Sequence, residues 1–365
     1  MQNPRFPRAE LPTPALVLDQ AALARNIEKM AAFAAARGIA LRPHSKTHKS
    51  SEIGRRQIEA GAVGLCCAKL GEAEALAADG VAGLHLTSPV VAAGAIKRLV
   101  TLNGRSDGLS VVADHPDNVR ALDAANAAGR PLAVLVDVDP GNHRTGVASP
   151  EAAVALAAAI AAAANLTLAG VQFYCGSQQH IQDFAERRAA IVERTDYLRT
   201  VLAALRAAGH DIQVVTGGGT GTYLIDAELG VLTELQTGSY IFLDREYGDC
   251  ELAPGDAPVF EPALFLDATV ISANASGMVT VDAGLKALST DAGPPVRIGG
   301  GRYAFMGDEH GAVFVENGAL PGLGGRVTLQ PGHCDPTVNL HDYYHLIDGD
   351  QVVEIWPVTA RGRST

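Results

Sequence analysis

Residues 132–174 read LAVLVDVDPGNHRTGVASPEAAVALAAAIAAAANLTLAGVQFY, and they carry the clearest local signal for the fold class. Two apolar, β-branched runs lie at its ends, and an alanine-rich stretch that opens with Pro150 lies between them. A short apolar run suits a strand that is buried on both faces, whereas the longer small-residue stretch suits a helix. The two runs and the helix between them predict a βαβ unit of a parallel sheet.

The same alternation extends in both directions, from about residue 20 to residue 240. Apolar runs that predict strands begin at Ile39, Ala62, Gly83, Gly108, Leu132, Leu166, Asp211 and Leu232. Amphipathic stretches that predict helices cover residues 20–37, 50–60, 71–79, 92–102, 116–128, 150–164 and 183–208. Eight strands with intervening helices predict a closed (β/α)8 barrel of the TIM type over residues 20–244, with an open doubly wound sheet as the alternative.

The composition and the hydrophobic pattern of the sequence change after about residue 244. Gly and Pro become frequent, and short alternating runs such as ALFLDATVISA from Ala263 and QVVEIWPV from Gln351 predict antiparallel strands. We therefore expect a second, mainly antiparallel β domain over residues 245–365. The early run PALVLD from Pro14 precedes the first barrel helix and is expected to join this domain, so residues 1–19 are assigned to it.

The composition is that of a globular protein. Hydrophobic residues make up 47% of the 365-residue chain, which is enough for sizeable cores. The formal net charge of -11 opposes a phosphate backbone and an anionic membrane surface, so neither nucleic acid nor a membrane is an expected partner. The sequence shows neither a secretory pattern nor a membrane-spanning apolar run, so we expect a cytoplasmic protein whose five scattered cysteines are thiols.

The segment RPHSKTHKS, residues 42–50, follows the first predicted barrel strand. Because the chemistry of such barrels collects at the carboxyl ends of the strands, these cations are expected at the active site, and a solvated basic patch is the alternative. Lys46 would lie at the opening of the barrel beside other cations. Such neighbours lower the pKa of a lysine, so that more of its amine is neutral and nucleophilic. We therefore predict that Lys46 forms a Schiff base with an aldehyde cofactor.

Two glycine-containing loops predict a phosphate cradle for that cofactor. VVTGGGTGTY follows the seventh predicted strand, and QTGSYIF follows the eighth. Barrels of this type bind phosphate at these positions, through backbone N–H groups and hydroxyls. Neither loop has a Walker or dinucleotide pattern. The cofactor-binding candidates in the two loops are Thr216, Gly218, Gly219, Thr220, Gly238, Ser239 and Tyr240.

A third motif, QPGHCDPTVNLHDYY at residues 330–344, predicts a metal site. His333 and Asp335 lie two apart, and in an extended backbone such residues point the same way, so both can bind one ion. An imidazole and a carboxylate, rather than several thiolates, suit Mn²⁺ best, then Mg²⁺ or Co²⁺, with Zn²⁺ as a further option. A structural pair without a metal is the alternative.

The segments RPHSKTHK, GGGTGTY and PGHCDPTVNLHD, together with the barrel-plus-β-domain plan, resemble the D-threonine aldolase and D-serine dehydratase family of fold-type III pyridoxal-phosphate enzymes. The barrel of this family is like that of alanine racemase, and the resemblance spans essentially the whole chain. It implies that Lys46 binds pyridoxal 5'-phosphate, that a divalent metal ion is required, and that the enzyme is a homodimer.

The resemblance also implies roles for four further residues. Arg144 and Tyr174 match residues near the cofactor and the substrate, and His180 matches a histidine that faces the substrate hydroxyl and acts as the base. Asp308 matches a residue that lines the substrate site from the second domain. Without the resemblance, Arg144 would be expected to pair with a neighbouring aspartate, Tyr174 to lie in the barrel core, His180 to begin the long helix and Asp308 to lie in a turn.

Members of this family act on 3-hydroxy D-amino acids and differ in which bond breaks. The aldolases carry the H-x-D pattern, whereas the dehydratases place a thiolate where Asp335 stands. A carboxylate keeps a harder, more labile ion that suits deprotonation of an alcohol. The resemblance therefore implies an aldehyde-lyase that cleaves D-threonine and other D-3-hydroxy amino acids to glycine and an aldehyde. A D-serine or D-threo-3-hydroxyaspartate dehydratase, a non-catalytic pyridoxal-phosphate carrier and an amino-acid racemase are the alternatives.

Overall fold

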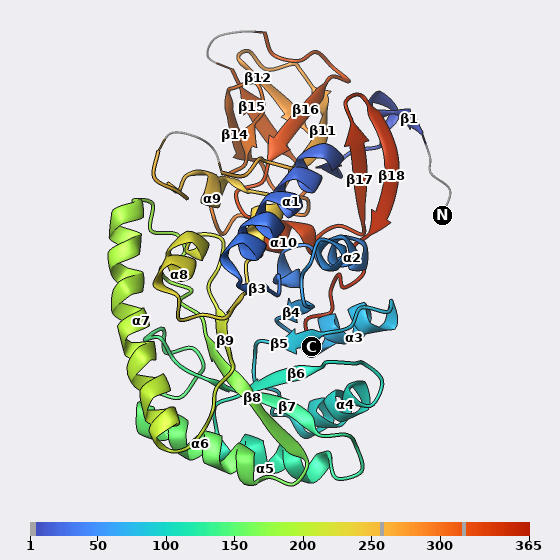
Figure 1. Ribbon diagram of the computed structural model, residues 1–365. Helices are drawn as coiled ribbons and strands as arrows, with labels where there is room; N and C mark the ends of the chain where they lie inside the picture. The colour runs from blue at the N-terminus through green and yellow to red at the C-terminus, as the bar shows by residue number, and fades with distance from the viewer. Residues whose placement is uncertain (1–4, 256–258, 316–318) are drawn as a thin grey trace.

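The computed structural model describes residues 5–255, 259–315 and 319–365. Figure 1 shows two parts, a barrel whose strands are surrounded by helices and a second sheet, drawn largely in orange and red, at one end of it. Helix α1 (Gln20–Arg37) lies where the two parts meet. The predicted fold class, an α/β barrel with a second and mainly antiparallel β part, is confirmed.

Eight parallel strands form the barrel, and their order in the sheet is β3-β10-β9-β8-β7-β6-β5-β4. They are β3 (Ala40–Leu41), β4 (Leu65–Cys67), β5 (Leu84–Leu86), β6 (Ser110–Ala113), β7 (Leu132–Asp137), β8 (Leu166–Phe173), β9 (Val214–Gly217) and β10 (Glu234–Leu235). A parallel bridge between His44 and Cys66 joins the two edge strands, and the N–H of Cys66 donates to the carbonyl of Pro43 (2.8 Å). This bridge closes the barrel.

The barrel helices begin at side chains that cap their free N–H groups. Asp19 accepts a hydrogen bond from the N–H of Ala22 (2.9 Å) at the start of α1, and Gly38 ends this helix in the left-handed region. Ser149 caps α6 through the N–H of Ala152 (3.2 Å). The other barrel helices are α2 (Ser51–Glu59), α3 (Leu70–Ala78), α4 (Ala93–Asn103), α5 (Pro116–Ala125), α6 (Pro150–Ala162), α7 (Phe184–Ala207) and α8 (Tyr223–Leu229).

Ten strands form the second sheet, which is antiparallel except where β2 runs beside β17. They are β1 (Phe6–Pro7), β2 (Ala15–Asp19), β11 (Leu264–Ser272), β12 (Met278–Val281), β13 (Val296–Arg297), β14 (Arg302–Phe305), β15 (Gly311–Phe314), β16 (Arg326–Gln330), β17 (Tyr343–Asp348) and β18 (Gln351–Pro357). Leu16 of β2 pairs with Leu266 of β11, and both side chains are fully buried. The early strand therefore belongs to this sheet.

The predicted helices lie within a few residues of the observed ones, but the predicted strands are too long. The first one, expected from Ile39 through the RPH of the motif, ends at Leu41, because Pro43 has no N–H to donate and residues Ser45–Thr47 form the 3-10 turn η2. The eighth, expected to begin at Leu232, covers only Glu234–Leu235, and the 3-10 turn η3 (Ser239–Ile241) follows it. Sequence analysis does not predict the short helices α8, α9 (Arg245–Gly248) and α10 (Cys334–Val338).

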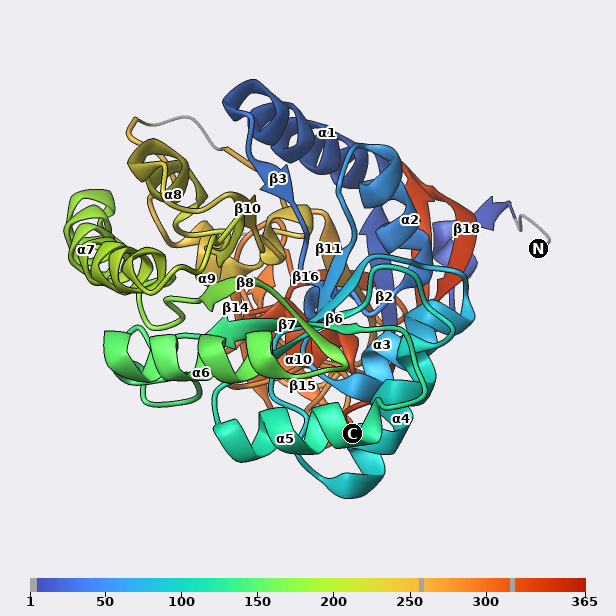
Figure 2. The ribbon, with the colours of Figure 1, turned by 60° about the horizontal axis from the view of Figure 1, so that its bottom comes forward.

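Helix α10 positions the candidate metal motif against the barrel. It packs against η2, which follows the first barrel strand, although the two segments lie far apart in the sequence. In Figure 1, α10 lies between the barrel strands and the second sheet, and in Figure 2 it appears behind the barrel, near the centre of the molecule. The two most specific motifs of the sequence are therefore neighbours at the carboxyl end of the barrel.

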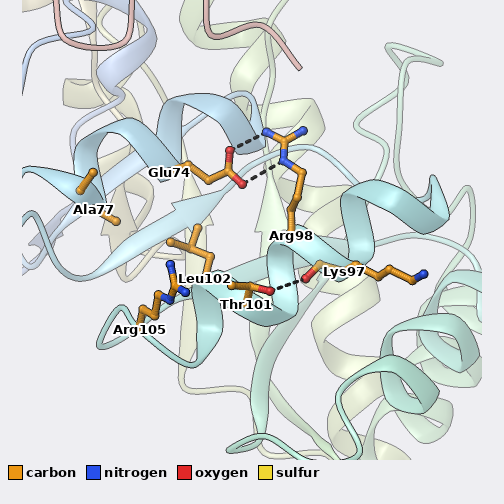
Figure 3. Close-up of a pocket in the computed structure, with 8 residues that line it drawn as sticks. Glu74, Ala77, Lys97, Arg98, Thr101, Leu102 and Arg105 are labelled. Carbon is orange, nitrogen blue, oxygen red and sulfur yellow. Dashed lines mark hydrogen bonds and ion pairs between the residues drawn. The ribbon is translucent and has the colours of Figure 1, made fainter.

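A separate cavity of about 430 Å³ lies between α3 and α4 (Figure 3). Arg98 and Glu74 form a two-pronged ion pair there, with 2.9 Å between Arg98 Nε and Glu74 Oε1. None of the predicted site residues lines this cavity.

Across residues 5–255, 259–315 and 319–365, no helix is both long and apolar enough to cross a membrane.

Candidate active site

Lys46 projects from η2 into a cavity of about 230 Å³ at the carboxyl end of the barrel strands. The turn is fixed from two sides, because Ser45 Oγ donates to the carbonyl of Cys66 (2.8 Å) and His44 Nδ1 accepts from the N–H of Lys46 (3.3 Å). The ammonium of Lys46 donates to the carboxylate of Asp335 on α10. The cavity is lined by His44, Lys46, Ala68, Thr87, Ser88, Arg144, Gln172, Tyr174 and Gln236.

The prediction that neighbouring cations lower the pKa of Lys46 is wrong. Burial is the largest single effect and acts against the ammonium, but the neighbouring acidic groups, Asp335 first and then Tyr174 and Asp244, together outweigh it and raise the pKa of Lys46 above its usual value. In return, Lys46 and His333 outweigh the effect of burial and lower the pKa of Asp335 to about 2. The lysine and the carboxylate therefore hold opposite charges in one contact.

The other cations of the RPHSKTHKS segment do not form a solvated basic patch. Burial lowers the pKa of His44 well below its usual value and that of His48 to about 3, so both imidazoles are neutral. Lys49 is buried and its ammonium pairs with Glu72 of α3. These three residues therefore do not place a positive charge at the cavity lining, which includes His44 but neither His48 nor Lys49.

Arg144 and Tyr174 lie together on the cavity wall. The guanidinium of Arg144 stands over the Tyr174 ring, 5.6 Å from its centroid. Arg144 forms no ion pair with an aspartate among the described residues, because the Asp139 carboxylate accepts from the N–H groups of Gly141 (2.9 Å) and Asn142 (2.8 Å). Asp137 Oδ1 accepts from Gln172 Nε2 (2.9 Å), and the charge of Arg144 acts on Asp137 without a direct contact. Arg144 is therefore the cationic side chain of this wall.

A polar network that sequence analysis did not single out forms another wall of the cavity. Gln236 Nε2 donates to Gln172 Oε1 (3.2 Å) and to Thr216 Oγ1 (3.0 Å), and Gln172 Nε2 donates to Asp137 Oδ1 (2.9 Å). His85 Nε2 also contacts Gln172 Oε1 (3.0 Å). The available signal was the presence of glutamines in runs that otherwise read as buried barrel strands. Thr216 therefore does not line the cavity itself, but it accepts a hydrogen bond from the lining residue Gln236.

The glycine loop after β9 is built tightly against the protein. Gly218 has φ +69°, and a Cβ there would lie 2.5 Å from Asp226 Oδ2. A Cβ at Gly219 would lie 2.4 Å from Gln179 Oε1. The N–H of Gly219 donates to Thr222 Oγ1 (3.2 Å). The packing of the loop therefore explains these two glycines. The sequence suggested another reason, namely that they let the backbone come close to a phosphate group.

Some donors of the predicted cradle remain free for an anion. Within the described residues, the N–H groups of Gly218, Thr220, Gly238 and Ser239 donate to no protein acceptor. Tyr240 differs, because its N–H donates to Thr220 Oγ1 (3.0 Å) and its hydroxyl accepts from Gln57 Nε2 (3.0 Å). Four unused backbone donors at the ends of β9 and β10 fit a phosphate group.

His333 and Asp335 approach each other, but not through an extended backbone as predicted. His333 is extended and precedes α10, whereas Asp335 lies in its first turn, and His333 Nε2 stands 3.9 Å from Asp335 Oδ1. Asp335 Oδ1 is buried and has no hydrogen-bond partner in the described part of the chain. A buried carboxylate oxygen without a partner, next to an imidazole nitrogen, fits a divalent cation.

Asp291 is a further member of this site that sequence analysis missed. Its Oδ2 lies 2.6 Å from His333 Nδ1, so the other ring nitrogen, Nε2, is turned toward Asp335. No sequence signal links Asp291 to His333, because it lies in a loop 42 residues away. Among the residues that the structure describes, no group of three or more His, Cys, Asp or Glu side chains could hold a metal. An ion here would have two protein ligands and would take the rest from water or substrate.

His180 lies in the turn before α7 and does not begin that helix, whose capping residue is Asp183. Its ring packs on Tyr247 of α9 (4.5 Å between centroids), and its Nδ1 lies 3.5 Å from Glu246 Oε1. Burial lowers the pKa of His180; Glu246 opposes this effect, while the nearby charges of His333 and Lys46 add to it. The imidazole is therefore neutral near pH 7 and can accept a proton.

Asp308 is not brought to the cavity within this chain. It lies exposed in the turn between β14 and β15, where its carbonyl accepts from the N–H of Lys286 (3.0 Å). It is not among the residues that line the cavity next to Lys46.

The fold and the site together define a barrel in which the candidate cofactor lysine, Lys46, contacts the candidate metal motif of His333 and Asp335. The Alanine racemase, N-terminal domain family matches residues 18–246, and a serine dehydratase domain family matches residues 263–347. The chain is 40% identical, over 99% of its length and 95% of the relative, to 3-hydroxy-D-aspartate aldolase of Paracoccus denitrificans (strain Pd 1222). It is also 40% identical, over 99% of its length and 96% of the relative, to D-threonine aldolase of Arthrobacter sp..

A solved structure of D-threonine aldolase from Filomicrobium marinum superimposes with a TM-score of 0.95 at 40% identity, and the match covers 100% of both chains. The chain belongs to the alanine racemase-like family that contains these aldolases, and it is an enzyme of the lyase class. Membership of this family implies pyridoxal phosphate as the cofactor.

Proposed function

We propose that this enzyme is a pyridoxal-phosphate- and metal-dependent aldolase that cleaves D-threonine and other D-3-hydroxy amino acids to glycine and an aldehyde. The observation that carries the proposal is the contact between Lys46 and Asp335, which joins the predicted cofactor lysine to the predicted metal motif. A reaction that needs an electron sink at Cα and an acidified hydroxyl at Cβ requires these two groups side by side.

The residues present fit both groups. Lys46 would hold the aldehyde of pyridoxal phosphate, and the unused N–H groups of Gly218, Thr220, Gly238 and Ser239 would hold its phosphate. His333 and Asp335 would hold the divalent ion, for which Mn²⁺ is the first choice. When bound, the cofactor withdraws electrons from the bonds at Cα, and the metal lowers the pKa of the 3-hydroxyl.

The chain supplies a base and an orienting wall for this reaction. His180 is neutral near pH 7, because burial lowers its pKa, so it can take the proton of the 3-hydroxyl as the Cα–Cβ bond breaks. Arg144 is a cationic side chain of the cavity wall that is suited to an anionic group of cofactor or substrate. Asp308 would line the substrate site only if a second copy of the chain brought it there, which fits a homodimer.

A dehydratase is the competing function, and one observation favours the aldolase. The residue that contacts Lys46 is a carboxylate whose pKa is lowered to about 2 by Lys46 and His333 against the effect of burial, so it stays ionised as a hard oxygen ligand. A hard, labile ion suits deprotonation of an alcohol better than the expulsion of hydroxide from a tightly bound zinc site.

Product analysis tests the proposal. The purified protein is incubated with D-threonine, pyridoxal phosphate and Mn²⁺, and separately with 3-hydroxy-D-aspartate. We expect equal amounts of glycine and acetaldehyde from the first substrate, and of glycine and glyoxylate from the second. Release of ammonia with 2-oxobutanoate from D-threonine would instead assign the protein as a dehydratase. Lys46→Ala should abolish turnover, whereas the exposed Lys97→Ala should not.

A further inference from the structure

Arg187 is a buried charge outside the cavity. Its side chain is fully buried on the first turn of α7, and within the described residues its hydrogen bonds go to backbone carbonyls and not to a carboxylate. Its Nη1 donates to the carbonyls of Ile181 and Gln182 (3.3 Å for the latter), and its Nη2 donates to the carbonyl of Glu251. The guanidinium therefore joins two loop segments through their backbone.

Stability alone does not explain an arginine at this position. A buried guanidinium loses its hydration, and three neutral carbonyls replace water less well than a carboxylate would. An apolar side chain of similar length would avoid that cost. Nε of Arg187 also has no partner in the described part of the chain. The residue is thus better explained by the geometry that it imposes on the two segments.

Both segments belong to the surroundings of His180. Ile181 and Gln182 follow it directly, and Glu251 lies three residues after the end of α9, which carries Glu246 and Tyr247 against the His180 ring. The N–H of Glu251 donates to the carbonyl of Gln182 (3.0 Å) and adds to the same junction. Arg187 therefore fixes how the His180 turn sits on the α9 segment.

The α9 segment is in turn tied to the metal motif. The N–H of Glu246 donates to the carbonyl of Gly332 (3.1 Å), and Asp244 Oδ2 accepts from the N–H of Cys334 (2.9 Å). Hydrogen bonds thus run from Arg187 through α9 to the residues on either side of His333. This path connects the turn that carries His180 to the metal motif.

We propose that Arg187 is a positioning residue that holds His180 in register with His333 and Asp335. The inference rests on the proposed function, in which His180 is the base. Arg187 lines neither the cavity next to Lys46 nor the metal motif, so it acts only through the backbone on either side of the His180 turn.

The test compares Arg187→Met with Arg188→Met, a matched control on the next residue of α7, whose exposed side chain pairs with Glu228. With pyridoxal phosphate and Mn²⁺ bound, we expect Arg187→Met to lower kcat for D-threonine cleavage about tenfold to a hundredfold, because a base displaced by about 1 Å costs this much. KM and cofactor absorbance should change little, and Arg188→Met should match the wild type. Arg187→Lys keeps the positive charge but has fewer hydrogen-bond donors, so we expect it to recover part of the lost kcat. It replaces Arg187→Met as the test variant if the methionine variant does not fold.

A second readout does not depend on turnover. The chain has 11 histidines, so ring-¹³C-labelled protein gives a spectrum in which the His180 signal is assigned from its loss in His180→Gln. We expect this signal to shift or broaden in Arg187→Met and Arg187→Lys and to stay unchanged in Arg188→Met. An unchanged His180 signal, or an unchanged kcat per bound cofactor, would overturn the positioning role. A wild-type protein that cleaves no D-3-hydroxy amino acid would instead overturn the proposed function.

Discussion

The ammonium of Lys46 contacts the carboxylate of Asp335, although 289 residues separate the two in the sequence. One residue comes from the turn after the first barrel strand, and the other from a short helix between two strands of the second sheet. Closure of the barrel onto that sheet therefore creates the site. Each member changes the other, because their charges raise the pKa of Lys46 and lower that of Asp335 against the effect of burial.

Asp335→Asn should make cofactor capture easier at low pH. The lysine must be neutral to bond the aldehyde, and removal of the Asp335 charge leaves burial as the larger effect, which lowers the pKa of Lys46. In metal-free buffer, the pH midpoint for the rise of cofactor absorbance in the apoprotein should fall by about one to three units. Asp342→Asn, on an exposed side chain paired with Arg361, should leave the midpoint in place. A midpoint that Asp335→Asn leaves unchanged would show that this contact does not control the lysine.

His180→Ala should separate cleavage from cofactor binding. The loss of a positioned base should lower kcat for D-threonine about a hundredfold to ten-thousandfold, while the absorbance of the bound cofactor stays at the wild-type level. His210→Ala, in the loop after α7, is the matched control. Full activity of His180→Ala would assign the proton transfer to another group.

The acid limb of the pH profile should report His180. Burial lowers its pKa, so the base stays neutral below the usual histidine value, and kcat/KM should fall only at a pH below about 6.5. The Glu246 carboxylate raises the pKa of His180, so Glu246→Gln should move the acid limb to still lower pH. An acid limb that moves upward in this variant would contradict the assignment.

Asp291→Asn should weaken metal binding without touching the cofactor. The carboxylate fixes His333 Nδ1, and loss of such a support lowers metal affinity about tenfold to a hundredfold. Titration of activity with Mn²⁺ measures the change, and His333→Ala should show the stronger defect. Both variants should keep the cofactor absorbance, and Asp350→Asn is an exposed control. Equal Mn²⁺ affinity in Asp291→Asn and wild type would remove Asp291 from the site.

Glu72→Ala should destabilise the turn that carries Lys46. It leaves the ammonium of Lys49 buried without its partner, which costs about 3–5 kcal/mol of unfolding free energy. Denaturant unfolding of the apoprotein measures the loss. Glu309→Ala breaks an exposed pair with Lys286 and should leave the stability unchanged. A small effect of Glu72→Ala would mean that the pair contributes little to the turn.

The sequence predicts the barrel well because its signals are local. The helix α1 was expected over residues 20–37 and is observed there, since Asp19 and Gly38 mark its two ends. Strand lengths are less predictable, because Pro43 ends a run that hydropathy alone would extend. The motif residues Lys46 and Asp335 could be found from sequence patterns, but their contact could not.

The properties that could not be predicted from the sequence mostly depend on charges that are distant in the chain and close in space. The pKa of Lys46 is raised rather than lowered because acidic groups around it, first among them the Asp335 carboxylate from a distant segment, together outweigh burial. Asp291 and Arg187 carry no motif and are identified only by what they contact. Asp308 remains a prediction, since this chain alone leaves it exposed.

The most direct measurement is a crystal structure of the protein with pyridoxal phosphate and Mn²⁺, with anomalous data collected for manganese. We expect continuous density from the cofactor to Lys46 Nζ and one manganese peak bound by His333 and Asp335. Density joined to Lys49 or to any other lysine, or a manganese peak remote from His333, would contradict it.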